Sequence, residues 1–163
     1  MFRQETLQMY DNSGNILALV RLCGNEVYVY PRLKVGVYAL SEGGKIEQNG
    51  LTPVFSYSFP DLSWDGPYDF KFEADLDALW MGGHRLIRSH VQKEGCELEH
   101  SLYKLTEQGF ETALIAEAHL TKDQLASLKR VAEDLREDKN SLTRLLSKYA
   151  REWDKQAAER IKK

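Results

Sequence analysis

The sequence has little of what membrane proteins and secreted proteins depend on. No apolar run approaches the roughly 18 residues that a membrane-spanning helix needs. The first residues lack the basic segment and apolar stretch of a signal peptide. There are only two cysteines, Cys23 and Cys96, which we expect to be a buried helix thiol and a loop thiol in a reducing compartment. We therefore expect a cytoplasmic protein that does not contact a membrane.

The motifs that enzymes use are also missing. The sequence has no Gly-x-Ser-x-Gly, no phosphate-binding glycine-rich loop and no His-Glu-x-x-His. Asp75 and Asp77 are two residues apart in a predicted helix, so they do not face each other as an acid–base pair must. His84, His90 and His100 match no ligand spacing, and no cysteine pair supports them. The sequence predicts a non-enzymatic protein with no catalytic residue, metal site or cofactor.

What is present is an ordinary globular composition with an uneven charge. Of the 163 residues, 42% are hydrophobic and 29% are charged, which suits one domain with a helical appendage. The net charge is −3, and residues 1–82, with 6 basic and 11 acidic side chains, hold all of the acidic excess. Residues 139–163 instead carry 8 basic and 3 acidic side chains. This basic tail fits either a nucleic-acid contact or a solvated helix face, and our interpretation is the solvated face.

The N-terminal part of the chain predicts a helix followed by a stop. Residues 16–23 space apolar side chains as a buried helix does, and Gly24 follows them. The alternative is a pair of strands, formed by residues 6–10 and 16–22. Our interpretation is the helix.

Proline and glycine then divide the next segment into short elements. Residues 27–30 are β-prone, and Pro31 can occupy the first position of a second helix, where its missing N–H is no loss. The glycines at 43–44 are expected to end that helix. Residues 54–59 alternate with period two and predict a strand.

The best-defined helix prediction covers residues 70–81. Gly66 and Pro67 predict a tight turn before it, and Asp69 is a suitable N-cap. The apolar residues that recur at helical spacing, and so predict its core stripe, are Phe72, Leu76, Leu79 and Trp80.

A hairpin and a further helix are predicted next. Strands are expected at 86–92 and 98–105, and Thr106 is expected to cap the helix that follows. The residues of that helix that we expect to point inward are Phe110, Leu114 and Ile115. Turn, helix, hairpin and helix in this order are the layout of a winged helix-turn-helix.

Two of these pieces, residues 66–69 (Gly-Pro-Tyr-Asp) and residues 103–109 (Tyr-Lys-Leu-Thr-Glu-Gln-Gly), carry a resemblance. Separated by one helix and one hairpin, they resemble the YwgA-like and Panacea-type winged-helix proteins, which are phage-associated and antitoxin-related bacterial proteins. The resemblance covers roughly residues 14–150. It implies an α+β fold, a winged helix-turn-helix with an N-terminal helical pair and a C-terminal helical extension. It also implies a role in binding protein or DNA.

The C-terminal part is expected to be helical. Thr121 and Gln124 form a capping box that opens a helix reaching about residue 138, and Ser141 caps the last helix. We expect residues 1–120 to form the winged-helix domain. Residues 121–163 would then pack on that domain or form an oligomer interface, which makes a homodimer one expected state.

Two sets of candidate site residues follow from these expectations. For a protein partner, such as the toxin that the resemblance implies, the candidates beside the proline turn and on the acidic helix are Trp64, Tyr68, Glu73, Asp75 and Asp77. For DNA, the candidates on the helix and the first hairpin strand are Lys71, Arg85, Arg88, His90 and Lys93. The acidic helix and the pI of about 5.8 favour the protein partner. The winged-helix layout favours the alternative, a DNA-binding transcriptional regulator.

Overall fold

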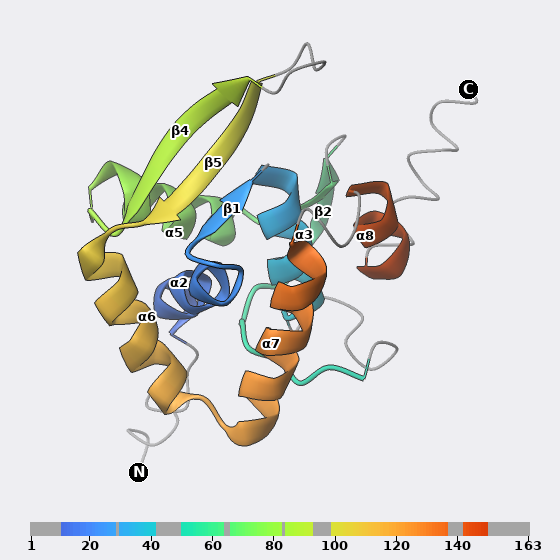
Figure 1. Ribbon diagram of the computed structural model, residues 1–163. Helices are drawn as coiled ribbons and strands as arrows, with labels where there is room; N and C mark the ends of the chain where they lie inside the picture. Colours follow the sequence, from blue (N-terminus) through green and yellow to red (C-terminus); the bar gives the residue numbers. More distant parts are fainter. Residues whose placement is uncertain are drawn as a thin grey trace.

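The computed structural model describes residues 11–28, 30–41, 50–63, 66–82, 84–92, 99–136 and 142–149. Within these ranges the fold is α+β, with six helices and two small antiparallel sheets (Figure 1). In chain order the elements are α2 (Asn12–Leu22), β1 (Glu26–Tyr28), α3 (Tyr30–Ala39), β2 (Asp61–Ser63), β3 (Gly66–Tyr68), α5 (Phe70–Met81), β4 (Leu86–Gln92), β5 (Glu99–Leu105), α6 (Glu107–His119), α7 (Lys122–Leu135) and α8 (Leu142–Tyr149). None of the helices in these ranges is both long and apolar enough to span a membrane.

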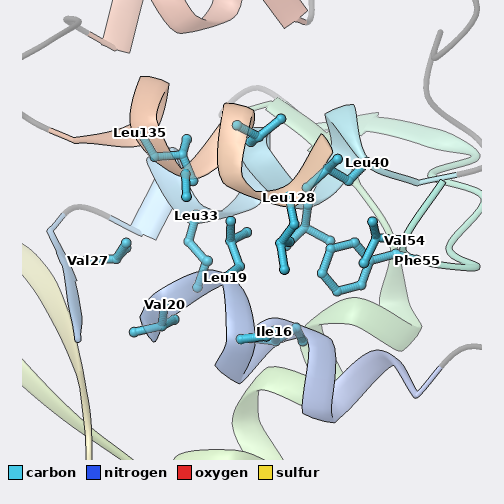
Figure 2. Close-up of a cluster of buried hydrophobic side chains, with 14 of the residues drawn as sticks. Ile16, Leu19, Val20, Val27, Leu33, Leu40, Val54, Phe55, Leu128 and Leu135 are labelled. Atoms are coloured by element: carbon cyan, nitrogen blue, oxygen red, sulfur yellow. The ribbon is translucent and has the colours of Figure 1, made fainter. Parts of the chain in front are cut away.

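Helix α2 is the centre of the hydrophobic core. Five consecutive residues, 16–20, are fully buried, so this helix is apolar on every side. It contacts α5, α6, α7 and the sheet, which together surround it (Figure 1). Figure 2 shows its side chains among those of α3, α7 and the segment after α3, and the labelled members of this core are Ile16, Leu19, Val20, Val27, Leu33, Leu40, Val54, Phe55, Leu128 and Leu135. The predicted helix at 16–23 is confirmed, although it begins earlier, at Asn12.

The larger sheet has the strand order β1-β5-β4, with antiparallel neighbours throughout. Val27 of β1 pairs with Tyr103 of β5, and Arg88 of β4 pairs with the same Tyr103 from the other side. The β4–β5 hairpin projects away from the helices, and α5 lies near its base (Figure 1). The predicted hairpin strands are confirmed, with the second beginning at Glu99.

The prediction of a strand at residues 54–59 is wrong. The segment forms only one isolated bridge, between Ser41 and Phe55. The expected alternation is real, because Ser56 and Ser58 are exposed between buried aromatic neighbours. The backbone of this extended segment, however, forms no strand ladder. The N–H groups of Val54 and Phe55 donate to the carbonyl oxygen of Leu40 at 2.8 Å and 3.0 Å, and other backbone groups bond to side chains of helices and caps.

Asparagine side chains at the start of α2 supply part of this bonding. Asn15 donates from Nδ2 to the carbonyl oxygen of Val54 at 3.0 Å. Asn12 accepts from the Ser56 backbone N–H at 3.1 Å and donates to the Ser56 hydroxyl at 2.8 Å. The buried backbone N–H and C=O groups of such a segment do not need a neighbouring strand, because a side-chain amide can form the same hydrogen bonds with them.

The turn predicted at Gly66 and Pro67 is also corrected. Both residues belong to β3, where Gly66 pairs with Ser63 and Pro67 pairs with Leu62. Proline has no backbone N–H to donate. A strand of three residues in a two-stranded sheet tolerates it, because not every residue has to donate a hydrogen bond to the neighbouring strand. The second helix is confirmed from Tyr30, but it ends at Ala39, before the predicted glycine stop.

The orientation predicted for α6 is wrong. The residues that this helix buries are small, namely Gly109, Ala113 and Ala116, and they allow close packing against α2. A Cβ atom at Gly109 would lie 2.0 Å from the carbonyl oxygen of Arg85, so this position requires glycine. Phe110, Leu114 and Ile115, which the sequence predicted to be inward, are instead 38%, 44% and 61% exposed.

The C-terminal helices pack on the rest of the fold. Helix α7 begins with the predicted capping box of Thr121 and Gln124, ends at Leu135, and contacts α2 and α3. Helix α8 packs on α3, and its Tyr149 hydroxyl donates to the Asp134 carboxylate of α7. Burial raises the pKa of Tyr149 most, and the hydrogen bond to Asp134 raises it further. The predicted cap Ser141 and the strand alternative at residues 6–10 lie outside the described residues.

Candidate interaction surface

The position of α5 is set by its N-cap, Asp69. This buried carboxylate accepts hydrogen bonds from the backbone N–H groups of Lys71 at 2.8 Å and Phe72 at 3.1 Å. Its second oxygen accepts from the backbone N–H groups of Ser58 at 3.1 Å and Phe59 at 2.9 Å. One side chain therefore caps the helix, as the sequence predicted, and also fixes it to the extended segment before it.

Helix α5 has apolar residues on two opposite sides. The buried side packs into the core through Phe72, Leu76 and Leu79. The exposed side, which we call the outer face of α5, consists of Phe70, Ala74, Ala78 and Met81. These four residues follow helical spacing and form one stripe. Phe70 is 74% exposed and Met81 is 66% exposed, so the two large side chains stand at the ends of a stripe with a small-residue centre.

The acidic residues of α5 do not form one exposed face. Asp75 is half-buried and accepts a hydrogen bond from the hydroxyl of buried Tyr57 at 2.5 Å. Burial raises the pKa of Tyr57 most, and the hydrogen bond to Asp75 raises it further. Glu73 is half-buried, and Asp77 is exposed and accepts from Trp80 Nε1 at 3.1 Å. Asp75 is therefore a half-buried side chain whose carboxylate holds Tyr57, and its contact with a partner stays a prediction.

Arg88, a DNA candidate on β4, is held against aromatic rings. Its guanidinium carbon lies 5.0 Å from the ring centroid of Trp80 and 5.9 Å from that of Tyr103. Within the described part of the chain its buried Nε has no hydrogen-bond partner, as expected for a guanidinium enclosed by rings. Burial raises the pKa of Tyr103 to about 12, while the nearby Arg88 charge lowers it and the carboxylates of Asp77 and Glu73 raise it. Arg88 thus connects the hairpin to α5.

The other DNA candidates divide into three groups. Arg85 is half-buried and donates from Nε to the Thr112 hydroxyl of α6 at 3.3 Å, so it connects the start of the hairpin to α6. Lys71 is exposed at the start of α5. His90 pairs with Ser101 in the β4–β5 ladder, and its side chain, like the whole of Lys93, lies outside the described residues. Among the three candidates whose side chains the structure describes, Lys71 is exposed, whereas Arg85 and Arg88 are half-buried.

The aromatic candidates for the protein partner are less informative. Trp64 lies outside the described residues. Tyr68 is half-exposed and pairs with Asp61 at the end of β3, one residue before the Asp69 cap. The candidate surface that the sequence interpretation missed is the outer face of α5, although the signal was present, since Phe70, Ala74, Ala78 and Met81 repeat at helical spacing opposite the core stripe.

Among the described residues, no group of three or more histidine, cysteine or acidic side chains could hold a metal ion. The Cys23 thiol donates to the carbonyl oxygen of Ala132 at 3.7 Å, and burial raises its pKa to about 12.

Comparisons of this chain with protein-family models, with curated proteins and with solved structures found no match.

Proposed function

We propose that this protein is a non-enzymatic interaction module that binds a protein partner through the outer face of α5. The observation that carries the proposal is the exposure of Phe70 and Met81 at the two ends of that face. A helix that reads DNA presents Arg, Asn, Gln or Lys to the base edges. An apolar stripe offers no such donors, and exposed apolar patches of this kind are typical of protein-binding sites.

The arrangement of the elements supports a winged-helix origin for this module. Apart from β2 and β3, which lie between α3 and α5, the elements α2, β1, α3, α5, β4 and β5 follow the order expected of a winged helix. In this proposal α5 takes the place of the recognition helix and the β4–β5 hairpin that of the wing. One difference is the 30-residue segment 40–69 between α3 and α5, where a helix-turn-helix has a turn of three or four residues. We infer that the scaffold serves protein recognition, in an antitoxin-related role in which the partner is a toxin.

The charges beside the outer face indicate the chemistry of the partner. Asp77 is exposed next to Ala74 and Ala78, and Glu73 is half-buried on the same helix. The chain as a whole carries a net charge of −3. A partner that buries Phe70 and Met81 in apolar pockets and places basic side chains beside Asp77 would be complementary in both respects.

A DNA-binding regulator remains the second candidate, and one observation favours it. Lys71 on α5 and Lys104 on β5 are exposed, and both belong to the elements that correspond to the recognition helix and the wing. Against this, Arg85 and Arg88 are engaged within the fold. Titration of labelled duplex DNA at low and physiological salt separates the two functions, because phosphate contacts give binding that weakens steeply with salt.

The test of the proposed function uses variants of the outer face of α5. Tagged protein would be expressed in its native cells, and the co-purifying proteins quantified for the wild type and for Phe70→Glu with Met81→Glu. We expect a specific partner with the wild type and its loss with the variant, at an unchanged melting temperature, because both side chains are exposed. The matched control, which adds the same charge on exposed sites of α7 and α8, is Ala126→Glu with Ser147→Glu. Equal recovery of the partner with the α5 variant and the control would overturn the proposal.

A further inference from the structure

Strand β4 lies at the edge of the larger sheet. In the sheet order β1-β5-β4, β5 pairs with one side of β4, and among the described residues no strand pairs with the other side, which we call the outer edge of β4. All seven residues, Leu86–Gln92, pair with β5 in one unbroken register, and none of them is a proline. Bulges and prolines are common means of preventing an edge strand from pairing with another chain, and β4 has neither. The hairpin also projects away from the helices (Figure 1).

The hydrogen bonds at the base of the hairpin show which backbone groups point to the outer edge. The Thr106 N–H donates to the carbonyl oxygen of Arg85 at 3.1 Å, so Arg85 bonds toward β5. Leu105, which lies opposite Leu86, instead donates its N–H to Asn25 on the far side of β5. In an antiparallel pair these two kinds of residue alternate, so the odd-numbered residues of β4 bond to β5. The residues whose N–H and C=O groups point to the outer edge are Leu86, Arg88, His90 and Gln92.

This outer edge matches a second copy of itself in antiparallel orientation. A two-fold interface uses the same patch on both subunits, so that patch must be complementary to itself. The edge-facing residues are placed symmetrically about Ser89. Full overlap of two β4 strands therefore pairs Leu86 with Gln92 of the second copy and Arg88 with His90 of the second copy, and each edge-facing N–H and C=O gains a partner. We propose that β4 is a homodimer interface in which two copies of this chain pair their β4 strands antiparallel, with Ser89 opposite Ser89.

The side chains on the sheet face opposite α5 support this register. Ile87 is 52% exposed, and its neighbour across β5 is the exposed Lys104. In the dimer Ile87 lies opposite Val91 of the second copy, and the two-fold axis makes this pair twice. Two β-branched residues directly across an antiparallel pair stabilise it, so the sequence of β4 supplies the apolar contacts that its own pairing needs.

The charges of β4 do not oppose the pairing. The strand holds no acidic residue, and its described cation is Arg88. The guanidinium carbon of Arg88 lies 5.0 Å from the ring centroid of Trp80 and 5.9 Å from that of Tyr103, so its charge is engaged within its own subunit. The attraction between the two copies therefore comes from backbone hydrogen bonds and the apolar pairs. The proposal is independent of the function proposed for α5.

Sedimentation velocity of the full chain tests the proposal at about 5 µM to about 500 µM protein, because one strand from each copy makes a small interface of micromolar or weaker affinity. The wild type is expected to rise from 18.8 kDa toward twice that mass. His90→Pro removes an edge-facing N–H and is expected to weaken the dimer at least about tenfold, with little change in melting temperature, since an edge strand tolerates proline there. The matched control His90→Val keeps that N–H and is expected to dimerise as the wild type does. Ile87→Lys, at an exposed site, is expected to weaken the dimer without lowering the melting temperature.

Cysteine cross-linking tests the register. Ser89→Cys, in a chain that also carries Cys96→Ser, is expected to form a covalent dimer with oxidised glutathione. Opposite residues of a non-hydrogen-bonded antiparallel pair have Cα atoms about 4.5 Å apart, which a disulfide can bridge. Ile87→Cys in the same background is the control, because the proposed register places the two copies of residue 87 roughly 13 Å apart along the strands.

Three results would overturn the proposal. One is a wild type that stays monomeric at every concentration. Another is dimerisation of His90→Pro equal to that of His90→Val, because the edge-facing N–H would then have no role. The third is cross-linking of Ser89→Cys no faster than that of Ile87→Cys, which would exclude the antiparallel pairing centred on Ser89.

Discussion

The Arg88 guanidinium of β4 lies over the indole ring of Trp80 on α5, with 5.0 Å between the guanidinium carbon and the ring centroid. This contact joins the projecting hairpin to the helix at its base, and Tyr103 of β5 completes the enclosure. A side chain that the sequence makes a candidate for DNA contact thus fixes the hairpin to α5. Cation–π contacts that are shielded from water contribute more than exposed ones, so the orientation of the hairpin depends on this arginine.

Replacement of Arg88 is expected to destabilise the fold. Arg88→Ala should lower the free energy of unfolding by about 1–2 kcal/mol, because the contacts with both rings are lost. Urea denaturation followed by tryptophan fluorescence measures the loss. Lys104→Ala, an exposed site in β5, is the control and should change stability by less than about 0.5 kcal/mol. Equal effects of the two substitutions would mean that the ring contacts do not stabilise the protein.

Substitution of Asp69 should destabilise the fold more than substitution of most other polar residues. Asp69→Ala leaves four backbone N–H groups without their acceptor, two at the start of α5 and two in the preceding segment. We expect a loss of about 3 kcal/mol, from a missing N-cap together with buried donors left unpaired. Asp69→Ser should recover part of it, because serine caps the helix but is too short to reach Ser58 and Phe59 as well. Thermal unfolding of both variants checks this, and an Asp69→Ala protein as stable as the wild type would refute the role of this residue.

Alanine substitutions at Asp75 and Asp77 should differ sharply in their effect on stability, although both residues lie on α5. Asp75→Ala leaves the buried Tyr57 hydroxyl without its acceptor and should cost about 1–3 kcal/mol. Asp77→Ala changes an exposed side chain and should cost less than about 0.5 kcal/mol. A double-mutant cycle with Tyr57→Phe isolates the pair, and we expect a coupling of at least about 0.5 kcal/mol. No coupling in this cycle would contradict the hydrogen bond.

Stability should fall at alkaline pH because of three buried tyrosines. The pKa values of Tyr57, Tyr103 and Tyr149 are all raised in the folded protein, that of Tyr103 to about 12, whereas an unfolded chain gives about 10. Between these values the folded state binds more protons than the unfolded state, so the free energy of unfolding decreases as pH rises. The stabilisation that the three tyrosine hydroxyl groups contribute is fully present below about pH 10. It is lost as the pH rises above that value. Urea midpoints from pH 8 to about 11 measure the decline, Tyr103→Phe should make it shallower, and a flat profile would contradict the burial of these hydroxyl groups.

The sequence predicted those elements whose signals are local. Asp69 and the core stripe of α5 lie within one helix and its cap, and this helix has the predicted bounds, 70–81. The capping box of Thr121 and Gln124 is a contact over three residues, and it too is found as predicted. Cap geometry and helical spacing are decided by neighbouring residues, so they can be recognised without knowledge of the tertiary fold.

The predictions that failed depend on distant contacts. Large apolar residues of α6 are predicted to face the core, but the helix buries Ala113 and Ala116 instead and places Gly109 against the carbonyl oxygen of Arg85, where no side chain fits. Asp75, a partner candidate from the sequence, accepts a hydrogen bond from Tyr57, 18 residues away, and no local pattern reveals this contact. The alternation at 54–59 predicts a strand, but the segment bonds to the Leu40 carbonyl oxygen and to side chains, and the pattern reveals neither kind of partner.

The most direct test of protein recognition by the outer face of α5 is photo-crosslinking at position 70 in the native cells. A photoreactive phenylalanine analogue would replace Phe70, and in a parallel sample Ala126 of α7. The account predicts a discrete protein adduct at position 70 that is absent at position 126 and withstands nuclease treatment. An adduct that nuclease removes, or no adduct above that at position 126, would contradict it.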